Sequence, residues 1–234
     1  MSRCKVRSCL AVCMLLVLFI FLSMLPSFAQ NATNNQPAAR TSSTLATPQV
    51  GKELYSDDFS SSKSGWPIYS SGDILAGYKK GIYHVTIVPE DYWKGILAPN
   101  LNLSDFIVEV EATKEAGPDD NAYGIWIRNL APGSLYTFMI SSDGYFQLVE
   151  KENGTWITPS NWTKSSAIKT GNETNLIKVV AKGDEFAFYA NDVLLSNYSN
   201  DSFAYGGLGL WTGSQSEGNV TIGFDNFKVW AIKD

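Results

Sequence analysis

Short runs of alternating apolar and polar residues fill the chain from Leu54 onward, and they limit its fold more than any other feature. Each run has five to nine residues rich in Val, Ile, Tyr, Phe and Trp, and turn-forming residues separate one run from the next. In residues 81–88, for example, Tyr83, Val85 and Ile87 would share one face of a strand. No stretch shows an apolar stripe of helical period. The pattern predicts about a dozen strands in an all-β, two-sheet antiparallel β-sandwich, with a jelly roll favoured.

The N-terminal region, residues 1–29, predicts a signal peptide. Arg3, Lys5 and Arg7 form a positive leader, an apolar run follows to Leu25, and small residues then supply a cleavage site. An uncleaved membrane anchor is the alternative, because about 20 apolar residues span a bilayer. The predicted location is therefore secreted or on the extracellular face of the cell membrane, with membrane contact only through this segment.

Residues 30–50 predict a disordered spacer, and residues 51–234 predict one folded β-sandwich domain. The spacer is rich in Asn, Thr, Ser, Ala and Pro, and it holds one charge and no aromatic residue. It cannot bury enough apolar surface to offset the entropy of ordering it.

Composition limits the chemistry of the mature chain. Cys4, Cys9 and Cys13 are the only cysteines and lie in the leader, so a disulfide framework or a cysteine-bound metal is excluded after cleavage. The formal net charge of −5 becomes −8 once the three cations of the leader are removed. Such an acidic chain lacks the basic stripe that neutralises phosphates, which argues against a nucleic-acid partner.

Asparagine occurs unusually often in glycosylation sequons. Eight of the sixteen asparagines begin an Asn-x-Ser/Thr motif. In an exported protein these are glycan acceptors at exposed positions, and the alternative is accident in an Asn- and Thr-rich chain. The predicted acceptors are Asn31, Asn102, Asn153, Asn161, Asn172, Asn197, Asn200 and Asn219.

Several segments, in a fixed order, resemble the concanavalin A-like lectin/glucanase sandwich. More narrowly, they resemble the laminin-G-like and 3-keto-disaccharide hydrolase-like domains of exported microbial proteins. The resemblance implies two stacked, curved sheets, with any ligand groove on the concave side or at the loop rim. The segments are DDFSSSKSGWP, AGYKKGIYHVTI, SDFIVEVEAT, NAYGIWIR, LYTFMISSDGYFQLVEKENGTW, NWTKSSAIKTGNETNLIKVVAKGDEFAFYAND, GGLGLW and FDNFKVW.

Three acids are candidate ligands of a structural Ca²⁺ ion. Asp57 and Asp58 at the start of the domain and Asp225 near its end supply the carboxylate oxygens that Ca²⁺ prefers. The resemblance implies that the first and last strands lie side by side and that a calcium ion ties them together. The alternative is that these acids cap turns. No organic cofactor is predicted.

The aromatic residues predict a carbohydrate site. Sugars stack on indole and phenol rings while polar side chains take their hydroxyls. In residues 123–128, alternation puts Trp126 and Arg128 on the face opposite the core, and a guanidinium is poorly suited to an apolar core. Core packing is the alternative for any single aromatic residue. The predicted ligand-binding set is Trp126, Arg128, Tyr136, Tyr145, Gln147 and Trp156.

Catalytic signals are weak, and no catalytic residue is predicted. The Glu-x-Asp-x-x-Glu motif of laminarinase-type hydrolases is missing, and His84 is the only histidine. Glu109 and Glu111 share a strand face, but the alternative is that they are ordinary solvated residues.

An exported, non-catalytic β-sandwich that binds carbohydrate or another cell-surface polymer is therefore the favoured function. The alternatives are a glycoside hydrolase or 3-keto-disaccharide hydrolase-like enzyme, whose acids would be Glu109, Glu111 or Asp143, and a glycosylated structural surface protein.

Overall fold

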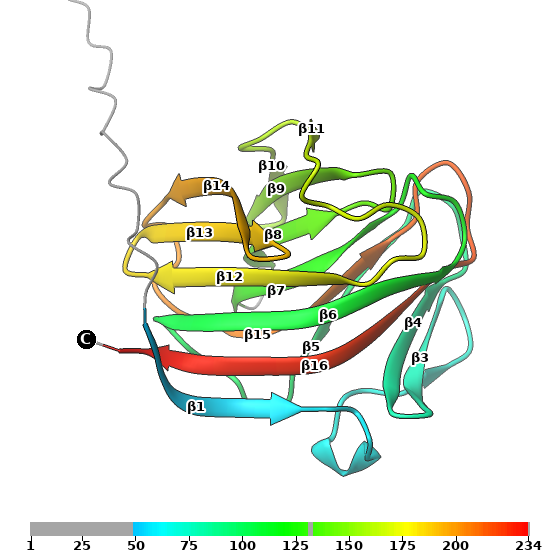
Figure 1. The fold of residues 1–234 in the computed structure, drawn as a ribbon, viewed down its shortest axis with the longest axis horizontal. Helices are drawn as coiled ribbons and strands as arrows, with labels where there is room; N and C mark the ends of the chain where they lie inside the picture. The colour runs from blue at the N-terminus through cyan, green and yellow to red at the C-terminus, as the bar shows by residue number, and fades with distance from the viewer. Residues whose placement is uncertain (1–48, 131–132, 234) are drawn as a thin grey trace, which may run out of the picture. The chain divides into compact units, whose positions relative to one another are not determined.

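Two antiparallel sheets form the domain in the computed structural model, which describes residues 49–130 and 133–233. The predicted all-β sandwich is confirmed (Figure 1). A single 3-10 turn, η1 (Ser62–Ser64), is the only helical element among the described residues. None of these residues belongs to a helix long and apolar enough to cross a membrane. The predicted signal peptide, most of the spacer and the sequon at Asn31 lie outside the described residues.

The larger sheet has nine strands. They run in the order β14-β13-β12-β6-β16-β4-β3-β2, and β1 also pairs with β16. The strands are β1 (Val50–Asp57), β2 (Tyr69–Ser70), β3 (Ile74–Lys79), β4 (Ile82–Ile87), β6 (Phe106–Ala116), β12 (Asn175–Lys182), β13 (Glu185–Ala190), β14 (Val193–Ser199) and β16 (Val220–Ile232).

The smaller sheet has seven strands, ordered β10-β9-β8-β7-β15-β5, and β11 also pairs with β9. Its strands are β5 (Trp93–Leu97), β7 (Ala122–Leu130), β8 (Ser134–Ile140), β9 (Tyr145–Glu152), β10 (Thr155–Ile157), β11 (Thr163–Lys164) and β15 (Gly207–Gly213). Strands β7 to β10 are neighbours in both sequence and space, whereas β15 lies between β7 and β5 and so joins distant parts of the chain.

The pairing of β1 with β16 brings the first and last strands together, as the resemblance implied. Val50 lies opposite Ile232, and Asp57 lies opposite Phe227. The register of β16 against β6 shifts between Asp225 and Lys228, so a bulge interrupts β16 beside the end of β1.

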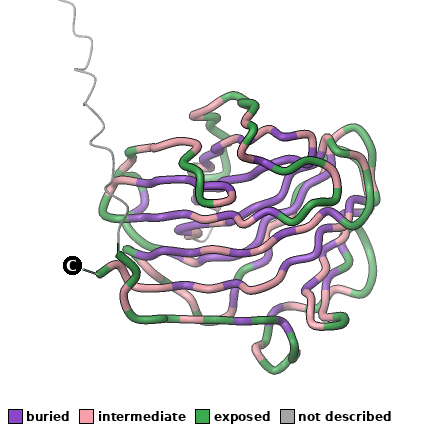
Figure 2. The backbone as a smooth tube through the Cα atoms, viewed as in Figure 1, coloured by how far each residue is buried: buried purple, intermediate pink, exposed green. Residues whose placement is uncertain are grey.

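The core lies between the sheets and follows the alternation of the sequence. Tyr83, Val85 and Ile87 of β4 are 0 to 1% exposed, as period-two alternation predicts. The rings of Phe138 on β8 and Phe188 on β13 stack across the sandwich with centroids 4.9 Å apart. Buried residues alternate with more exposed ones along β4 and most of β6, whereas β8, β13 and β15 are buried over nearly their whole length (Figure 2). One apolar layer therefore holds the sheets together and fixes which residues point outward.

Candidate functional site

Five tryptophans gather on the outer face of the seven-stranded sheet, and we call this the tryptophan face. Trp126 on β7 and Trp211 on β15 pack with their ring centroids 5.6 Å apart, and Trp156 on β10 contacts Trp211 at 5.9 Å. Trp93 on β5 and Trp162, just before β11, complete the set. Met139, Val149 and Ala122 form its apolar floor. Because the core face of these strands is filled separately, these rings are not needed to hold the two sheets together.

Glycines give two of these indoles room to lie against the sheet. A Cβ atom at Gly95 on β5 would lie 2.1 Å from Cε3 of Trp126, and a Cβ atom at Gly213 on β15 would lie 1.9 Å from Cδ1 of Trp93. Any larger residue at either position would therefore displace an indole. At these two positions the missing side chain lets an indole ring lie directly against the backbone of another strand.

Replacing Gly213 by Ala should push Trp93 off the sheet, because the backbone can accept Ala there but the indole cannot stay in place. We expect a large change in the Trp93 indole N–H resonance and a loss of about 1 kcal/mol in the free energy of unfolding. Gly77→Ala is the matched control, since its Cβ would meet only Ile68 at an ordinary 3.6 Å. An unchanged Trp93 resonance in Gly213→Ala would contradict the packing described here.

The tryptophan face surrounds a hollow of about 250 Å³, which we call the aromatic hollow. Trp93, Trp156, Trp162 and Trp211 line it, and the polar residues at its wall include Gln147 and Gln215. The side chains of Trp93 and Trp156 are 42% and 48% exposed, so two indoles are open to solvent. Trp211 is buried, and among the described residues no acceptor meets its indole N–H. The hollow thus offers exposed rings for stacking and two amide side chains for hydrogen bonding.

A second hollow of about 230 Å³, the polar hollow, adjoins the first. Its lining includes Asp120, Ser141, Asp143 and Tyr145, and Trp162 and Gln215 line both hollows. The Lys164 ammonium lies 5.2 Å from the centroid of the Tyr145 ring, and Ser141 donates a hydrogen bond to Asp143. The two hollows together make one continuous surface, which we call the aromatic surface. Indoles line one end of it, and the carboxylates of Asp120 and Asp143 line the other.

Three of the six predicted ligand-binding residues line this surface, and a fourth packs beside it. Trp156 and Gln147 line the aromatic hollow, and Tyr145 lines the polar hollow. Trp126 lines neither hollow but packs against Trp211 on the tryptophan face. Gln147 is already oriented by a 3.2 Å hydrogen bond that its side chain donates to the Ser160 carbonyl.

Sequence reasoning missed other residues of the surface, notably Trp93, Asp120 and Gln215. For Trp93 a signal was present: in the segment WKGIL, alternation puts Trp93, Gly95 and Leu97 on one face. For Asp120 and Gln215, which lie on turns distant in sequence, no local pattern indicates that they meet.

The prediction that Arg128 shares the outer face with Trp126 is wrong. Arg128 is 0% exposed and adopts a positive φ of 47° at an irregularity in the pairing of β7 with β8. The bulge turns the side chain inward. Its guanidinium donates to the carbonyls of Ser104, Phe203 and Gly183 at 2.7 to 3.2 Å. It also lies over the Phe186 ring. Arg128 is therefore part of the framework that joins loops at one end of the sandwich.

Tyr136 also points inward, so its predicted place in a ligand site is wrong. Its side chain is 0% exposed, and its hydroxyl donates a 2.7 Å hydrogen bond to the Oδ1 atom of Asn200. The Asn200 amide donates to Glu150 at 3.2 Å and to the Tyr198 hydroxyl at 3.0 Å. Burial raises the pKa of the Glu150 carboxyl and of the Tyr136 hydroxyl. These residues form a polar network between the sheets.

The predicted glycan acceptors differ in accessibility. Asn200 is half-buried and its amide nitrogen donates the hydrogen bonds just described, so a glycan there would have to break them. Asn197 is half-buried, and its Oδ1 atom is buried without a partner among the described residues. Glycosylation itself stays a prediction. The exposed acceptors are Asn102, Asn153, Asn161, Asn172 and Asn219.

The three acids predicted to bind calcium are electrostatic neighbours. Burial raises the pKa of the Asp225 carboxyl, and the nearby carboxylates of Glu111, Asp58 and Asp57 raise it further. The Oδ1 atom of Asp57 accepts from the Phe59 N–H at 2.8 Å, whereas its buried Oδ2 atom has no partner among the described residues. A cation would be stabilised by these neighbouring carboxylates and by the Asp57 Oδ2 atom, which lacks a hydrogen-bond partner among the described residues.

The proximity of Asp57, Asp58 and Asp225 does not by itself form a metal centre. Within residues 49–130 and 133–233, no group of three or more His, Cys, Asp or Glu is arranged to hold a metal ion. Asp58 accepts hydrogen bonds from the backbone and hydroxyl of Ser60, which is a turn-capping role. A bound ion would therefore need backbone carbonyls or water for most of its ligands.

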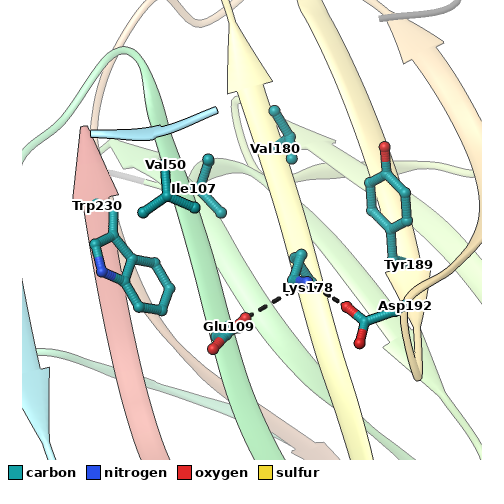
Figure 3. Close-up of a pocket in the computed structure, with 8 residues that line it drawn as sticks. All are labelled: Val50, Ile107, Glu109, Lys178, Val180, Tyr189, Asp192 and Trp230. Atoms are coloured by element: carbon teal, nitrogen blue, oxygen red, sulfur yellow. Dashed lines mark hydrogen bonds and ion pairs between the residues drawn. The ribbon is translucent and has the colours of Figure 1, made fainter. Parts of the chain in front are cut away.

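The candidate acids Glu109 and Glu111 lie on β6, in the opposite sheet from the tryptophan face. Glu109 lines a separate hollow on the outer face of the nine-stranded sheet (Figure 3). There Lys178 lies between Glu109, at 3.6 Å, and Asp192, to which it donates a hydrogen bond (Figure 3). In this hollow, Glu109 and Asp192 are therefore ion-pair partners of Lys178, and Glu109 lies outside the aromatic surface.

His84 also lies away from the tryptophan face, on β4. Its Nδ1 atom is 2.7 Å from Glu115 and its Nε2 atom is 3.1 Å from the carbonyl of Lys79. Both ring nitrogens therefore have partners on the same surface of the nine-stranded sheet, and no nucleophilic side chain is among the observed ring contacts.

Compared by sequence, the chain matches no protein-family model and no curated protein. Compared by structure, it is similar to the carbohydrate-binding module CBM66 from Bacillus subtilis, with a TM-score of 0.58 and 20% identity over 72% of this chain and 96% of the module. It is also similar to a B. subtilis protein of unknown function with a galectin-like fold, with a TM-score of 0.59 and 12% identity over 80% of this chain and all of that one.

A catalytic domain is similar to the chain to nearly the same degree. The endo-1,3-beta-glucanase (laminarinase) domain from Thermotoga petrophila RKU-1 has a TM-score of 0.56 and 10% identity over 80% of this chain and all of that domain. At such identities the likeness establishes the fold alone. The two-sheet jelly-roll fold predicted from the sequence, of the concanavalin A-like type, is confirmed, and the solved structures with a similar fold include both a carbohydrate-binding module and the catalytic domain of a laminarinase.

Proposed function

We propose that this chain is an exported, non-catalytic carbohydrate-binding protein whose tryptophan face holds the rings of a glycan. The observation that carries the proposal is a solvent-open hollow with four tryptophans in its wall, on a sheet face that the core does not need. Sugar rings present C–H faces that stack on indoles, and their hydroxyls need polar groups nearby. The side chains of Gln147 and Gln215 supply such groups.

A hydrolase acting on the same glycan is the alternative, because Asp143 does line the polar hollow beside the tryptophans. Glycoside hydrolysis needs two carboxyl groups on opposite sides of the scissile bond. Glu109 and Glu111 lie on β6 in the opposite sheet, which removes two of the three predicted acids from this surface. Asp120 and Asp143 line the polar hollow together, so a hydrolase at this surface would have to use this pair.

A screen of the exported chain against soluble and insoluble glycans tests the proposal, with product release measured for every glycan that binds. We expect binding without new reducing ends. Binding with product release would favour the hydrolase. Binding to none of the glycans would overturn the proposal and favour a glycosylated surface protein with a structural role.

We also propose that a structural Ca²⁺ ion binds where β1 meets the bulge of β16, with Asp57 and Asp225 as its acidic ligands and Asp58 beside them. The buried, unpartnered Oδ2 atom of Asp57 and the crowded Asp225 carboxyl support this proposal. A bound calcium ion would supply the positive charge that these carboxylates lack. No glycan contact is assigned to it.

Calcium at about a hundred times its dissociation constant should stabilise the fold by about 2.7 kcal/mol over the chelated protein. The melting temperature should then rise by about 8 °C. Asp225→Asn should lose this response, whereas Asp73→Asn, an exposed acid elsewhere, should keep it. In chelator, Asp225→Asn should be no less stable than wild type, since it removes a charge that burial and neighbouring acids disfavour. Equal melting temperatures with calcium and with chelator would rule out the ion.

A further inference from the structure

The aromatic surface has two chemically different ends, and the difference restricts which glycan fits. The aromatic hollow is lined by indoles, whereas the polar hollow beside it is lined by Asp120 and Asp143. Trp162 and Gln215 line both, so a chain of linked sugars can pass from one hollow to the other.

The polar hollow accepts hydrogen bonds more than it donates them. Ser216 donates to the Oδ2 atom of Asp120, and Ser141 donates to Asp143, so each carboxylate has one hydroxyl partner and further acceptor capacity. None of the described residues that line this hollow is cationic. Lys164 lies beside it, but its ammonium is over the Tyr145 ring. The polar hollow therefore presents two carboxylates, with the Lys164 ammonium held over the ring of its lining residue Tyr145.

We propose that the polar hollow selects a sugar ring with a free amino group, so that the ligand is a glycan containing amino sugars rather than a uronate or sulfated one. The inference rests on the proposed function and deepens it. An ammonium group offers charge-assisted hydrogen bonds to ionised carboxylates, while a ring carboxylate or sulfate would be repelled. A second observation also points to a ligand: the adjoining aromatic hollow holds two solvent-exposed indoles, Trp93 and Trp156. The sugar next to the amino ring would stack on these indoles.

Four oligosaccharides of about equal length test this inference: cellohexaose, chitohexaose, fully deacetylated chitohexaose and an oligoglucuronate. By calorimetric titration we expect the deacetylated form to bind about tenfold more tightly than cellohexaose, and the oligoglucuronate about tenfold more weakly. The advantage of the free amine should shrink in 1 M NaCl, because salt screens partly exposed charges.

The double variant Asp120→Asn, Asp143→Asn should lose the preference for the free amine and keep its affinity for cellohexaose. Asp73→Asn, an exposed acid away from the surface, is the control and should behave as wild type. A melting curve confirms that the double variant folds.

Two results would overturn the inference while leaving the proposed function intact. One is binding of neutral glycans with no preference for the amine, and the other is a preference that survives in the double variant. Preferential binding of the oligoglucuronate would also overturn it, and would point to Lys164 as the selecting group. If no glycan in the set or in the wider screen binds, the proposed function fails with it.

Discussion

Replacing Arg128 by Ala should cost about 4 kcal/mol in the free energy of unfolding, the largest effect we expect from any single substitution. The guanidinium is 0% exposed and donates four hydrogen bonds to three backbone carbonyls. Its removal leaves a cavity beside Phe186 and three carbonyls without their donor. Losses of this size are typical when one partner of a buried charged network is removed. The corresponding drop in melting temperature is about 10 °C.

Chemical denaturation of Arg128→Ala and Arg128→Lys checks this expectation. The lysine variant should recover little stability, because one ammonium cannot reproduce the forked geometry that reaches Ser104, Phe203 and Gly183 together. Lys182→Ala, which removes an exposed cation at the end of β12, is the control and should change stability by less than about 0.5 kcal/mol. A loss below about 1 kcal/mol for Arg128→Ala would mean that the network is not formed.

Replacing Trp156 by Ala should weaken glycan binding about thirtyfold while leaving the melting temperature nearly unchanged. Trp156 is 48% exposed, so its removal opens no core cavity. It lines the aromatic hollow, contacts Trp211 and lies under the Lys151 ammonium at 4.6 Å. Exposed aromatic anchors at the centre of a binding surface contribute about 2 kcal/mol, which corresponds to that loss of affinity.

Tyr205→Ala is the matched control for Trp156→Ala. Tyr205 is 53% exposed and lines neither hollow, so its removal tests whether any surface aromatic residue has the same effect. Calorimetric titration with a glycan that binds wild type should give an unchanged affinity for Tyr205→Ala. Affinities within about twofold of each other for the two variants would remove Trp156 from the site.

Alternation in the sequence predicts much of the fold because the side-chain period of a strand is fixed. In β7 it correctly separates inward Tyr123, Ile125 and Ile127 from outward Trp126. It fails one residue beyond Ile127, where a positive φ breaks the period and turns Arg128 into the core. A bulge of this kind depends on pairing with another strand, which a single sequence segment does not reveal.

The burial of Arg128 also could not be predicted, because the carbonyls that it meets lie 24, 55 and 75 residues away in the chain. The candidate site is limited in the same way, because residues that are distant in sequence meet there only in the folded chain. Trp156 and Gln147 come from adjoining strands and were found together, whereas Trp93 and Asp120 meet them only through the strand order of the sheet.

Tyr136 shows a further limit of alternation. Both faces of its segment are apolar in sequence, so the pattern does not say which side faces the core. The structure puts Tyr136, Phe138 and Ile140 inside and Met139 under the tryptophan face. An aromatic residue on a strand of this kind is placed only by its packing partners.

The chain has seven tryptophans, and their indole N–H resonances test the central claim most directly. Trp66 is buried in the core, Trp230 lines the hollow on the nine-stranded sheet, and the other five form the tryptophan face. On titration with a glycan that binds, we expect the resonances of Trp93, Trp156, Trp162 and Trp211 to shift while those of Trp66 and Trp230 stay in place. A shift confined to Trp230, or no indole shift on binding, would mean that the tryptophan face does not hold the glycan.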